Sequence, residues 1–395
     1  MSGFVLSCAH VLPVSSPPVK NGAVAVENGK IKALGTAEEI GKRFPSFAVR
    51  ELGEGVLLPG FVNCHTHLEL GWLRPEGGFE SFTGWLSHII TKKLRGPEPG
   101  ELERSVRGGA AELMRCGVTT VGEISSYGAD ADILKNSPFR TVLFREVTDG
   151  KPAFPARLEH GGRYEERIFP HAPYSCSPEL IRAAFARSEK ENIPSGIHLA
   201  ESPEETLFVR GGKNGITEKI YPLLGKPPME RHTADTPFEY LEKTGTGKTK
   251  ITLVHMAHVT DGEIRRAGEK NMGVVLCPGS NRFLGTGDAP ALKYAKIKRV
   301  GIGTDGLSSN TSLNFFNEMK LLRDMLLPLG EDEAAKTAVR MATLGGAEAL
   351  FLEDRIGSAT PGKDADLIFI RTGKTDDPYK AVVSANSAET VSRGR

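Results

Sequence analysis

The chain has no long hydrophobic run and no excess of either charge. Its 395 residues include 50 Lys and Arg against 49 Asp and Glu, for a formal net charge of +1. No stretch reaches the roughly 18 consecutive apolar residues that a membrane helix needs. A near-neutral chain without a dense basic segment has no electrostatic reason to bind nucleic acid or an anionic membrane. These absences favour a globular protein that acts on a small molecule.

Cysteine is scarce, and no two cysteines form a CxxC pair. There are five, spread along the whole chain: Cys8, Cys64, Cys116, Cys176 and Cys277. An odd, scattered set fits reduced thiols better than a disulfide framework. Residues 4–14 are moderately apolar, but they are interrupted by polar residues and proline and have no basic leader, so we do not interpret them as a signal peptide. We expect a cytoplasmic protein.

Both ends of the chain have the patterns of β-structure. Two short apolar runs, 22–26 and 31–34, flank Asn28-Gly29, a strong hairpin signal because both turn positions need a positive φ. Near the other end, 366–370 is predicted as a strand and 381–383 as a second, shorter one. The sequence therefore predicts a small β-sandwich domain built from residues 1–58 and 352–395.

Residues 59–351 alternate between short apolar runs and helical stretches. We expect strands at 56–62, 119–123, 141–147, 167–169, 195–199, 252–255, 273–277 and 300–303, and helices at 102–116, 178–191, 261–270 and 331–350. Eight strands that alternate with helices favour a (β/α)8 barrel, although an open doubly wound sheet gives the same alternation. The predicted fold class is α/β, a distorted (β/α)8 barrel with the small β-sandwich domain attached.

Metal-binding residue types stand at the ends of several predicted strands. They are, in chain order, His65, His67, His198, His255 and Asp305. The carboxyl ends of barrel strands meet at one rim, where sites form. One histidine alone is more often a structural group than a ligand, but five metal-capable residues at one rim indicate a metal site. Imidazoles with a carboxylate suit Zn²⁺ or Fe²⁺ and leave a position for water.

A carboxylate stands close to one of these histidines. Glu201 follows His198 by three residues, so a loop after the strand can bring it over the same metal. A metal lowers the pKa of bound water to about 7, and a nearby carboxylate can carry the proton to a leaving group. The alternative is that Glu201 simply begins a helix, where acidic residues are common. Both interpretations are compatible.

Six segments together resemble one known family, the amidohydrolase superfamily, in its chlorohydrolase and nucleobase-deaminase branch. They are LPGFVNCHTHLE at 58–69, PHAPYS at 170–175, HLAES at 198–202, CPGSN at 277–281, GTDG at 303–306 and PGKDADL at 361–367. They span nearly the whole chain in the order of that family. Each is weak alone, and jointly they are specific.

The resemblance implies a single divalent metal in a distorted barrel; we favour Zn²⁺, and Fe²⁺ stays open because it suits the same ligands. Its ligands would be His65, His67, His198 and Asp305. Binuclear relatives place a lysine at the end of the fourth strand, and 169–173 contains none. By the same resemblance, Glu201 is the proton shuttle, His255 hydrogen-bonds the attacking oxygen, and Asp305 is also the base that deprotonates the attacking water.

The implied reaction is hydrolytic deamination, in which water activated by the metal attacks an amino-bearing ring carbon and ammonia leaves. The resemblance places His171, Ser280, Asn281 and Ser308 around the substrate. Segments 66–70 and 81–86, which include Trp85, look like those of the aminodeoxyfutalosine deaminases, which act on an adenine nucleoside carrying a benzoate. Glu69 would then contact the ribose and Arg145 the carboxylate, although a salt bridge at the rim suits Arg145 equally.

Two other functions stay open at this stage. The enzyme could hydrolyse C–Cl or cyclic C–N amide bonds of a heterocycle, or the chain could be a non-catalytic scaffold of the same fold. Glu201 with His255 favours deamination, and the intact ligand set argues against a scaffold. As partners we expect a small-molecule substrate, no nucleic acid and no membrane, and a homodimer is compatible with this kind of barrel.

Overall fold

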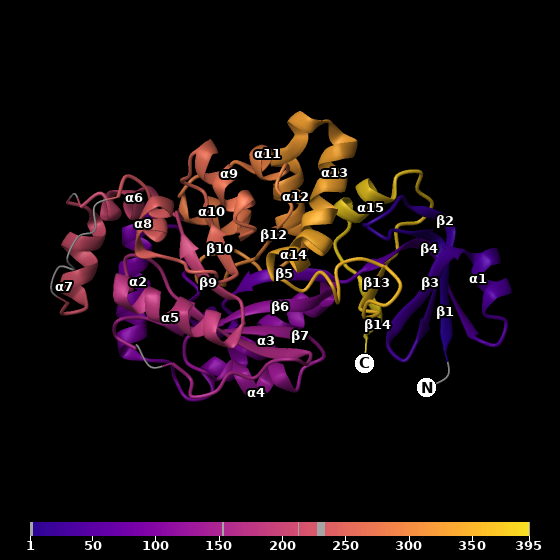
Figure 1. Ribbon diagram of the computed structural model, residues 1–395, viewed down its shortest axis with the longest axis horizontal. Coiled ribbons are helices and arrows are strands. Elements are labelled where there is room, and N and C mark those ends of the chain that lie inside the picture. Colours follow the sequence, from indigo (N-terminus) through magenta and orange to yellow (C-terminus); the bar gives the residue numbers. More distant parts are fainter. Residues whose placement is uncertain (1–2, 152–153, 212, 227–233, 395) are drawn as a thin grey trace.

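The molecule is elongated, with a barrel at one end and a small sheet at the other (Figure 1). The computed structural model describes residues 3–151, 154–211, 213–226 and 234–394. The middle of the chain forms an eight-stranded sheet, and the two chain ends together form a six-stranded one. The predicted β-structure formed jointly by the two chain ends is confirmed.

The eight-stranded sheet is parallel and nearly closed. Its order is β8-β7-β6-β5-β12-β11-β10-β9. The strands are β5 (Phe61–Thr66), β6 (Val118–Ser125), β7 (Arg140–Val147), β8 (Tyr164–Pro170), β9 (Ser195–Leu199), β10 (Ile251–His255), β11 (Gly273–Leu276) and β12 (Val300–Ile302). The two edge strands meet, because the Ser195 hydroxyl donates to the carbonyl oxygen of Ile168 at 2.6 Å. The predicted (β/α)8 barrel is therefore confirmed.

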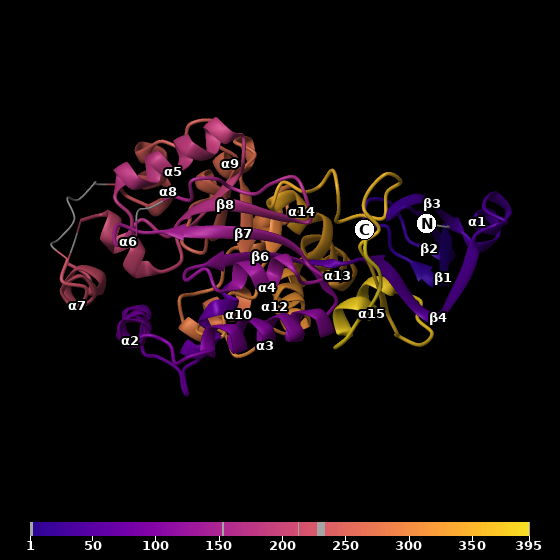
Figure 2. The same cartoon turned by 90° about the horizontal axis from the view of Figure 1, so that it is seen from below.

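Helices surround the barrel, as Figure 2 shows from below. They are α2 (Phe82–Arg95), α3 (Glu101–Arg115), α4 (Asp130–Lys135), α5 (Pro178–Glu191), α6 (Pro203–Val209), α7 (Tyr221–Leu223), α8 (Pro237–Thr244), α9 (Asp261–Glu269), α10 (Pro278–Leu284), α11 (Ala291–Tyr294), α12 (Phe315–Leu326), α13 (Glu331–Arg340) and α14 (Gly346–Ala349). The predicted helix at 331–350 contains a π-helical turn, Met341–Gly345, between α13 and α14. Within the described ranges, no helix has both the length and the apolarity needed to cross a membrane.

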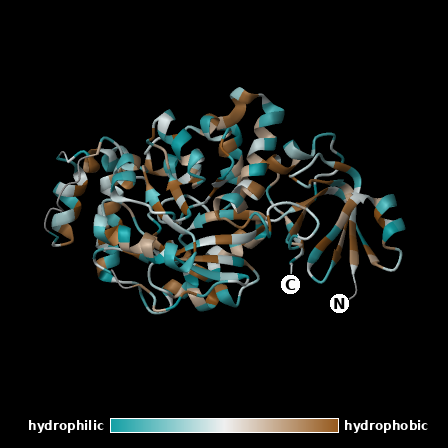
Figure 3. Ribbon diagram, in the orientation of Figure 1, coloured by the Kyte–Doolittle hydropathy of each residue, from teal (hydrophilic) through white to brown (hydrophobic). Residues whose placement is uncertain are grey.

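The small sheet has the order β14-β13-β4-β1-β2-β3. Its strands are β1 (Phe4–Val11), β2 (Val19–Glu27), β3 (Lys30–Thr36), β4 (Ala48–Pro59), β13 (Leu367–Ile370) and β14 (Glu389–Ser392), and α1 (Ala37–Arg43) packs beside them. The predicted hairpin turns at Asn28 and Gly29, with φ of 51° and 70°. In Figure 3 these strands are largely brown and α1 is mostly teal, so the sheet buries its apolar residues and the helix faces water. The six strands belong to one sheet rather than to two facing sheets.

The predicted first barrel strand, 56–62, was misplaced. Its first half ends β4 of the small sheet at Pro59, and its second half begins β5 of the barrel at Phe61. Gly60 lies between them, and a Cβ there would come within 2.1 Å of Thr119. Both strands are buried, so residues 56–62 form one continuous apolar run. The hydrophobic periodicity of the sequence therefore could not show where β4 ends and β5 begins.

The strand predicted at 381–383 was wrong, because these residues lie in α15 (Pro378–Ser384). The side chain of Asp377 accepts from the backbone N–H groups of Tyr379 and Lys380, and Pro378 stands at the first helical position. Both features begin a helix. Val382 and Val383 are buried there by packing, so their β-branched side chains mark a core face rather than a strand.

Candidate active site

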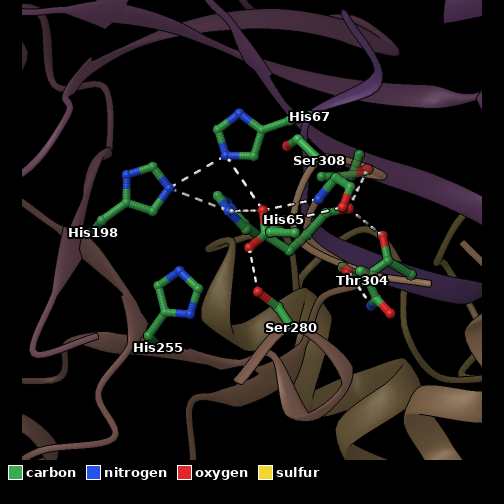
Figure 4. A network of polar contacts seen from close by, with 12 residues as sticks. His65, His67, His198, His255, Ser280, Thr304 and Ser308 are labelled. Carbon is green, nitrogen blue, oxygen red and sulfur yellow. Dashed lines mark hydrogen bonds and ion pairs between the residues drawn. The ribbon is translucent and has the colours of Figure 1, made fainter. Parts of the chain in front are cut away.

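Five metal-capable side chains come together at the carboxyl rim of the barrel (Figure 4). His65 stands near the end of β5, His198 near the end of β9, and His255 closes β10. His67 follows β5, and Asp305 follows β12 by three residues. These five side chains therefore lie at the carboxyl rim of the barrel, where the sequence predicted them.

The imidazole nitrogens of three histidines converge. Nε2 of His198 lies 3.3 Å from Nε2 of His65 and 3.3 Å from Nε2 of His67. Oδ1 of Asp305 lies 3.5 Å from Nε2 of His65 and 3.6 Å from that of His67. These side chains are almost fully buried. Nitrogens that face one another around a common point, with a carboxylate oxygen beside them, form a donor set for one cation.

The protonation states suit a metal. Burial, together with the neighbouring His65, lowers the pKa of His67 to about 3, and burial holds the pKa of His198 well below its usual range. These imidazoles are therefore neutral near pH 7 and present lone pairs. Burial alone would raise the pKa of Asp305, but its contacts with His65 and the other histidines hold it well below its ordinary value. Imidazole nitrogens together with one carboxylate fit Zn²⁺ or Fe²⁺.

Neighbouring groups orient these side chains. Nδ1 of His198 donates to the carbonyl oxygen of His171 at 2.9 Å, which leaves Nε2 as the lone-pair atom. Asp305 accepts from the Ser280 hydroxyl at 2.7 Å and from the Gly306 N–H at 2.9 Å. Asp305 and His255 both have positive φ, 56° and 75°. Such strained backbone is commonly held at functional sites.

Glu201 and His255 lie side by side next to this cluster. Nε2 of His255 is 3.6 Å from Oε1 of Glu201, and its Nδ1 is 3.2 Å from Oδ1 of Asn281, to which it donates. Burial raises the pKa of Glu201 well above its usual range. Glu201 also directly precedes Ser202, the N-cap of α6, as the interpretation of this carboxylate as part of a helix N-terminus predicts.

The cavity above the cluster is lined by three of the predicted substrate-binding residues. Trp85 of α2 donates from Nε1 to the carbonyl oxygen of Ser308 at 2.7 Å, and both residues line the cavity. His171 lines it from the end of β8, with its Nδ1 2.7 Å from the Ser175 hydroxyl. Ser280 and Asn281 do not line it. They contact Asp305 and His255 from behind.

Two predicted substrate contacts point elsewhere. The Glu69 carboxylate is fully buried and accepts backbone N–H groups of Ser126, Tyr127 and Ala129 at 2.6 to 2.8 Å. It therefore fixes the loop after β6 instead of lining the cavity. Arg145 forms an ion pair with Glu166, which is the salt bridge that the sequence left open as an alternative.

Two charged residues of the cavity were missed from the sequence. Glu146, at the end of β7, and Lys93, on α2, both line it. Glu146 accepts from the Ser126 hydroxyl at 2.8 Å, and its Oε1 is 3.9 Å from Nε2 of His171. Burial alone would raise the pKa of Glu146, but His171 and Lys93 lower it to about 2, so it is ionised. The available signal was the place of Glu146 near the carboxyl end of the third strand, next to Arg145, because successive side chains of a strand point to opposite faces.

Comparison with known sequences gives consistent matches over nearly the full chain. The family model described as "Amidohydrolase family" matches residues 56–394, and one for an imidazolonepropionase-like composite domain of bacteria matches 22–46. The 5-methylthioadenosine/S-adenosylhomocysteine deaminase of Thermodesulfovibrio yellowstonii is 28% identical over 417 residues, which cover 98% of this chain and 90% of that protein.

Solved structures match the fold. An adenosine deaminase from Xanthomonas campestris, with bound Zn, superimposes with a TM-score of 0.81 and 25% identity, covering 98% of this chain and 90% of the other. The Helicobacter pylori aminofutalosine deaminase in complex with methylthio-coformycin gives a TM-score of 0.84 and 23% identity, covering 98% and 97%. At this level of identity the second match concerns the fold alone.

Proposed function

Since the chain belongs to the amidohydrolase family, we propose that it is a hydrolytic deaminase of an adenine-like nucleoside. The observation that carries this proposal is the pair formed by Glu201 and His255, 3.6 Å apart beside the histidine cluster. A buried carboxyl with a raised pKa next to a donor set for a metal is what protonation of a ring nitrogen requires. The deaminases among its relatives support the same reaction.

Zn²⁺ is the metal of this proposal, with Fe²⁺ as the alternative. His65, His67, His198 and Asp305 would hold it, because their donor atoms converge and burial lowers the pKa of His67 and of His198. A bound divalent metal supplies Lewis acidity and makes water a nucleophile at neutral pH. The zinc found in the Xanthomonas relative is consistent with this choice.

The protein's own residues divide the proton transfers. Glu201 enters the reaction protonated and donates to the ring nitrogen, which makes the amino-bearing carbon more electrophilic. Asp305, which is ionised, accepts a proton from the attacking water. His255 faces the reacting oxygen through Nε2 while Asn281 fixes its ring. In the tetrahedral adduct Asp305 passes the proton it took from water to the amino group, which leaves as ammonia, and Glu201 takes the proton of the remaining hydroxyl as the carbonyl forms, so both carboxyl groups return to their starting states.

For the substrate we propose an adenine nucleoside with a substituent at the 5′ carbon, with aminodeoxyfutalosine among the candidates. The named substrates of the curated relatives, 5-methylthioadenosine and S-adenosylhomocysteine, belong to this class. We place the ribose hydroxyls at Glu146, because an ionised carboxylate facing the cavity accepts hydrogen bonds from a diol. Trp85 and His171 would enclose the base.

The proposal includes the cytoplasm as the site of action, because all five cysteines are free and buried. That the protein forms a homodimer, as the sequence analysis allows, stays a prediction.

The experiment is ammonia release by the metal-loaded protein from adenosine, 5′-methylthioadenosine, S-adenosylhomocysteine, aminodeoxyfutalosine, guanine and cytosine. We expect turnover of at least one adenine nucleoside and a loss of roughly a thousandfold in kcat for Glu201→Gln, as expected for a general acid. Glu218→Gln, an exposed carboxylate outside the cavity, is the matched control. Failure of every adenine nucleoside, with metal bound at one equivalent, would refute the proposal and direct the search to cyclic amides and chlorinated triazines.

A further inference from the structure

The carboxyl group of Glu201 is not held in place by contacts of its own. Across the described residues, no group donates a hydrogen bond to it, and Nε2 of His255 is 3.6 Å from its Oε1, which exceeds hydrogen-bond distance. The group is nevertheless buried beside the metal cluster, where its direction decides which atom it can protonate. The direction of this side chain therefore depends on the backbone that carries it.

That backbone turns sharply after β9. Ala200 has a positive φ of 54°, a conformation that residues with a Cβ rarely adopt. Its carbonyl oxygen accepts from the N–H groups of Ala257 at 3.0 Å and His258 at 2.9 Å, in the segment that follows His255. Backbone in such a conformation persists only where surrounding contacts hold it. The segments that carry Glu201 and His255 are thus joined at Ala200.

The N–H of Glu201 itself is bound by a buried side chain. Oε2 of Glu205 accepts it at 2.9 Å. Glu205 lies in the first turn of α6, and its own N–H donates to the hydroxyl of Ser202, the N-cap, at 3.2 Å. It does not line the cavity above the metal cluster. Glu205 therefore fixes the Glu201 backbone to the start of a helix from outside the cavity.

The neighbouring helix α8 begins in the same way (Figure 1). The segments SPEE at 202–205 and TPFE at 236–239 share one pattern, in which Ser or Thr is followed by Pro, any residue and Glu. In α8, Oε2 of Glu239 accepts the N–H of Asp235, the residue before the N-cap, at 2.8 Å. Helix α8 is therefore a reference for what the start of such a helix requires.

The two glutamates differ in burial. Glu239 is partly exposed, and its Oε1 accepts from Lys243 at 2.8 Å. Glu205 is fully buried, and within the described part of the chain no Lys or Arg pairs with it and its Oε1 has no hydrogen-bond partner. Burial raises the pKa of Glu205 to about 7, although the N–H of Glu201 lowers it. A buried carboxyl with an unpartnered oxygen is costly, and α8 shows that the helix does not require it, so Glu205 has a second role.

We infer that Glu205 is a positioning residue of the reaction, whose carboxyl group holds the Glu201 backbone so that the Glu201 side chain stays beside His255. The inference rests on the proposed function. The metal ligand His198 needs no such support, because its Nδ1 donates to the carbonyl oxygen of His171 and its backbone pairs with β10. Loss of Glu205 therefore impairs proton transfer and leaves metal binding intact.

The test compares Glu205→Ala, which removes the acceptor, with Glu205→Gln, whose amide oxygen still accepts the Glu201 N–H. Both substitutions are also made in the Glu201→Gln background. Glu239→Ala is the matched control, because it removes the same acceptor from α8. For each metal-loaded protein, kcat and KM are measured by ammonia release from the adenine nucleoside that the wild type turns over, and metal affinity is measured by calorimetry.

We expect Glu205→Ala to lower kcat about 10- to 100-fold, as a misplaced catalytic group does, with KM and metal affinity unchanged. Glu205→Gln should recover most of kcat, and Glu239→Ala should keep the wild-type value. In the Glu201→Gln background, Glu205→Ala should lower kcat no further, because it acts through the carboxyl group already removed. If Glu205→Ala does not fold, Glu205→Met, which fills the same space without an acceptor, takes its place.

A wild-type kcat in Glu205→Ala, an equal loss in Glu205→Gln, or a further loss in the Glu201→Gln background overturns the inference and leaves the deaminase proposal standing. If no nucleoside releases ammonia, the proposed function fails, and amide hydrogen exchange of Glu201 decides about its positioning. Faster exchange of the Glu201 N–H in Glu205→Ala, with protection kept in Glu205→Gln, then supports the role of Glu205, and unchanged exchange refutes it.

Discussion

The hydroxyl of Ser280 donates a hydrogen bond of 2.7 Å to Oδ2 of Asp305, while Oδ1 of the same carboxylate faces the histidine cluster. Oδ2 is thus fixed from behind, whereas Oδ1, which also accepts from the Gly306 N–H at 2.9 Å, is the oxygen on the side of the histidines. Ser280 is therefore a residue that holds a candidate metal ligand in place, and it can be tested by substitution. We expect Ser280→Ala to weaken metal affinity about 10- to 100-fold, the usual cost of removing a partner of a ligand. Metal titration followed by calorimetry checks this, and Ser16→Ala on the exposed surface should leave the affinity unchanged.

Removal of the metal should abolish activity and lower stability. His65, His67 and His198 beside a carboxylate form a site that the unfolded chain lacks, so metal binding adds to the free energy of unfolding. We expect dialysis against a chelator to eliminate ammonia release and to lower Tm by several degrees, with recovery on adding one equivalent of Zn²⁺. Recovery that required two equivalents would contradict a single-metal site.

Glu146 should control recognition of the sugar. Replacing its carboxylate by an amide in Glu146→Gln removes a charged acceptor that faces the cavity, and such hydrogen bonds contribute about 1.5 to 3 kcal/mol. We expect KM for adenosine to rise at least about tenfold with a smaller change in kcat. The comparison substrate is 2′,3′-dideoxyadenosine, whose KM should respond little. Equal effects on both nucleosides would show that Glu146 does not contact the hydroxyls.

Glu69 should act on stability rather than on chemistry directly. Its carboxylate accepts N–H groups of the loop at Ser126, Tyr127 and Ala129, and an amide can accept at only one atom. We expect Glu69→Gln to lower the free energy of unfolding by about 2 to 3 kcal/mol in urea, because buried donors lose their acceptor. Glu76→Gln, in an exposed position, is the control. A stable variant with lost activity would instead favour a direct contact with substrate.

Stability should depend on pH through Glu318. This side chain is buried, which raises its pKa to about 7 although it accepts from the Gly279 N–H and the Asn310 amide. A carboxyl whose pKa is higher in the folded protein than in the unfolded chain stabilises the fold at low pH, and that contribution is lost as pH rises to about 7. The loss amounts to at most about 3 kcal/mol.

The matched variant for this prediction is Glu318→Gln, whose amide does not titrate. Between pH 5 and pH 8 the wild type should lose stability relative to the variant in urea unfolding of the metal-loaded protein. Parallel pH profiles of the two proteins would show that Glu318 ionises with an ordinary pKa.

The sequence predicted the alternation of strands and helices well where local signals agree. Helix α5 was predicted with the same bounds, because Ser177 caps it, Pro178 opens it and Asn192 ends it in the left-handed region. Local signals failed where packing decides. The run 56–62 passes from one buried sheet to another without any change in hydrophobicity, and Val382 and Val383 gain their burial from a helix face.

The candidate metal ligands were found from the sequence because their position follows from topology alone. His65 and His198 stand at the carboxyl ends of strands, and every parallel barrel brings those ends to one rim. No knowledge of side-chain direction beyond the strand period was needed.

Only the tertiary structure decided which neighbouring side chains face the substrate. Arg145 and Glu146 are adjacent on β7, so one side chain must face away from the cavity when the other faces it. The sequence alone does not tell which of the two faces the cavity. Glu69 stands two residues after His67, yet backbone N–H groups from a loop more than 50 residues later hold its carboxylate away. Position along a strand determined the metal site, whereas contacts between distant segments determined the walls of the cavity.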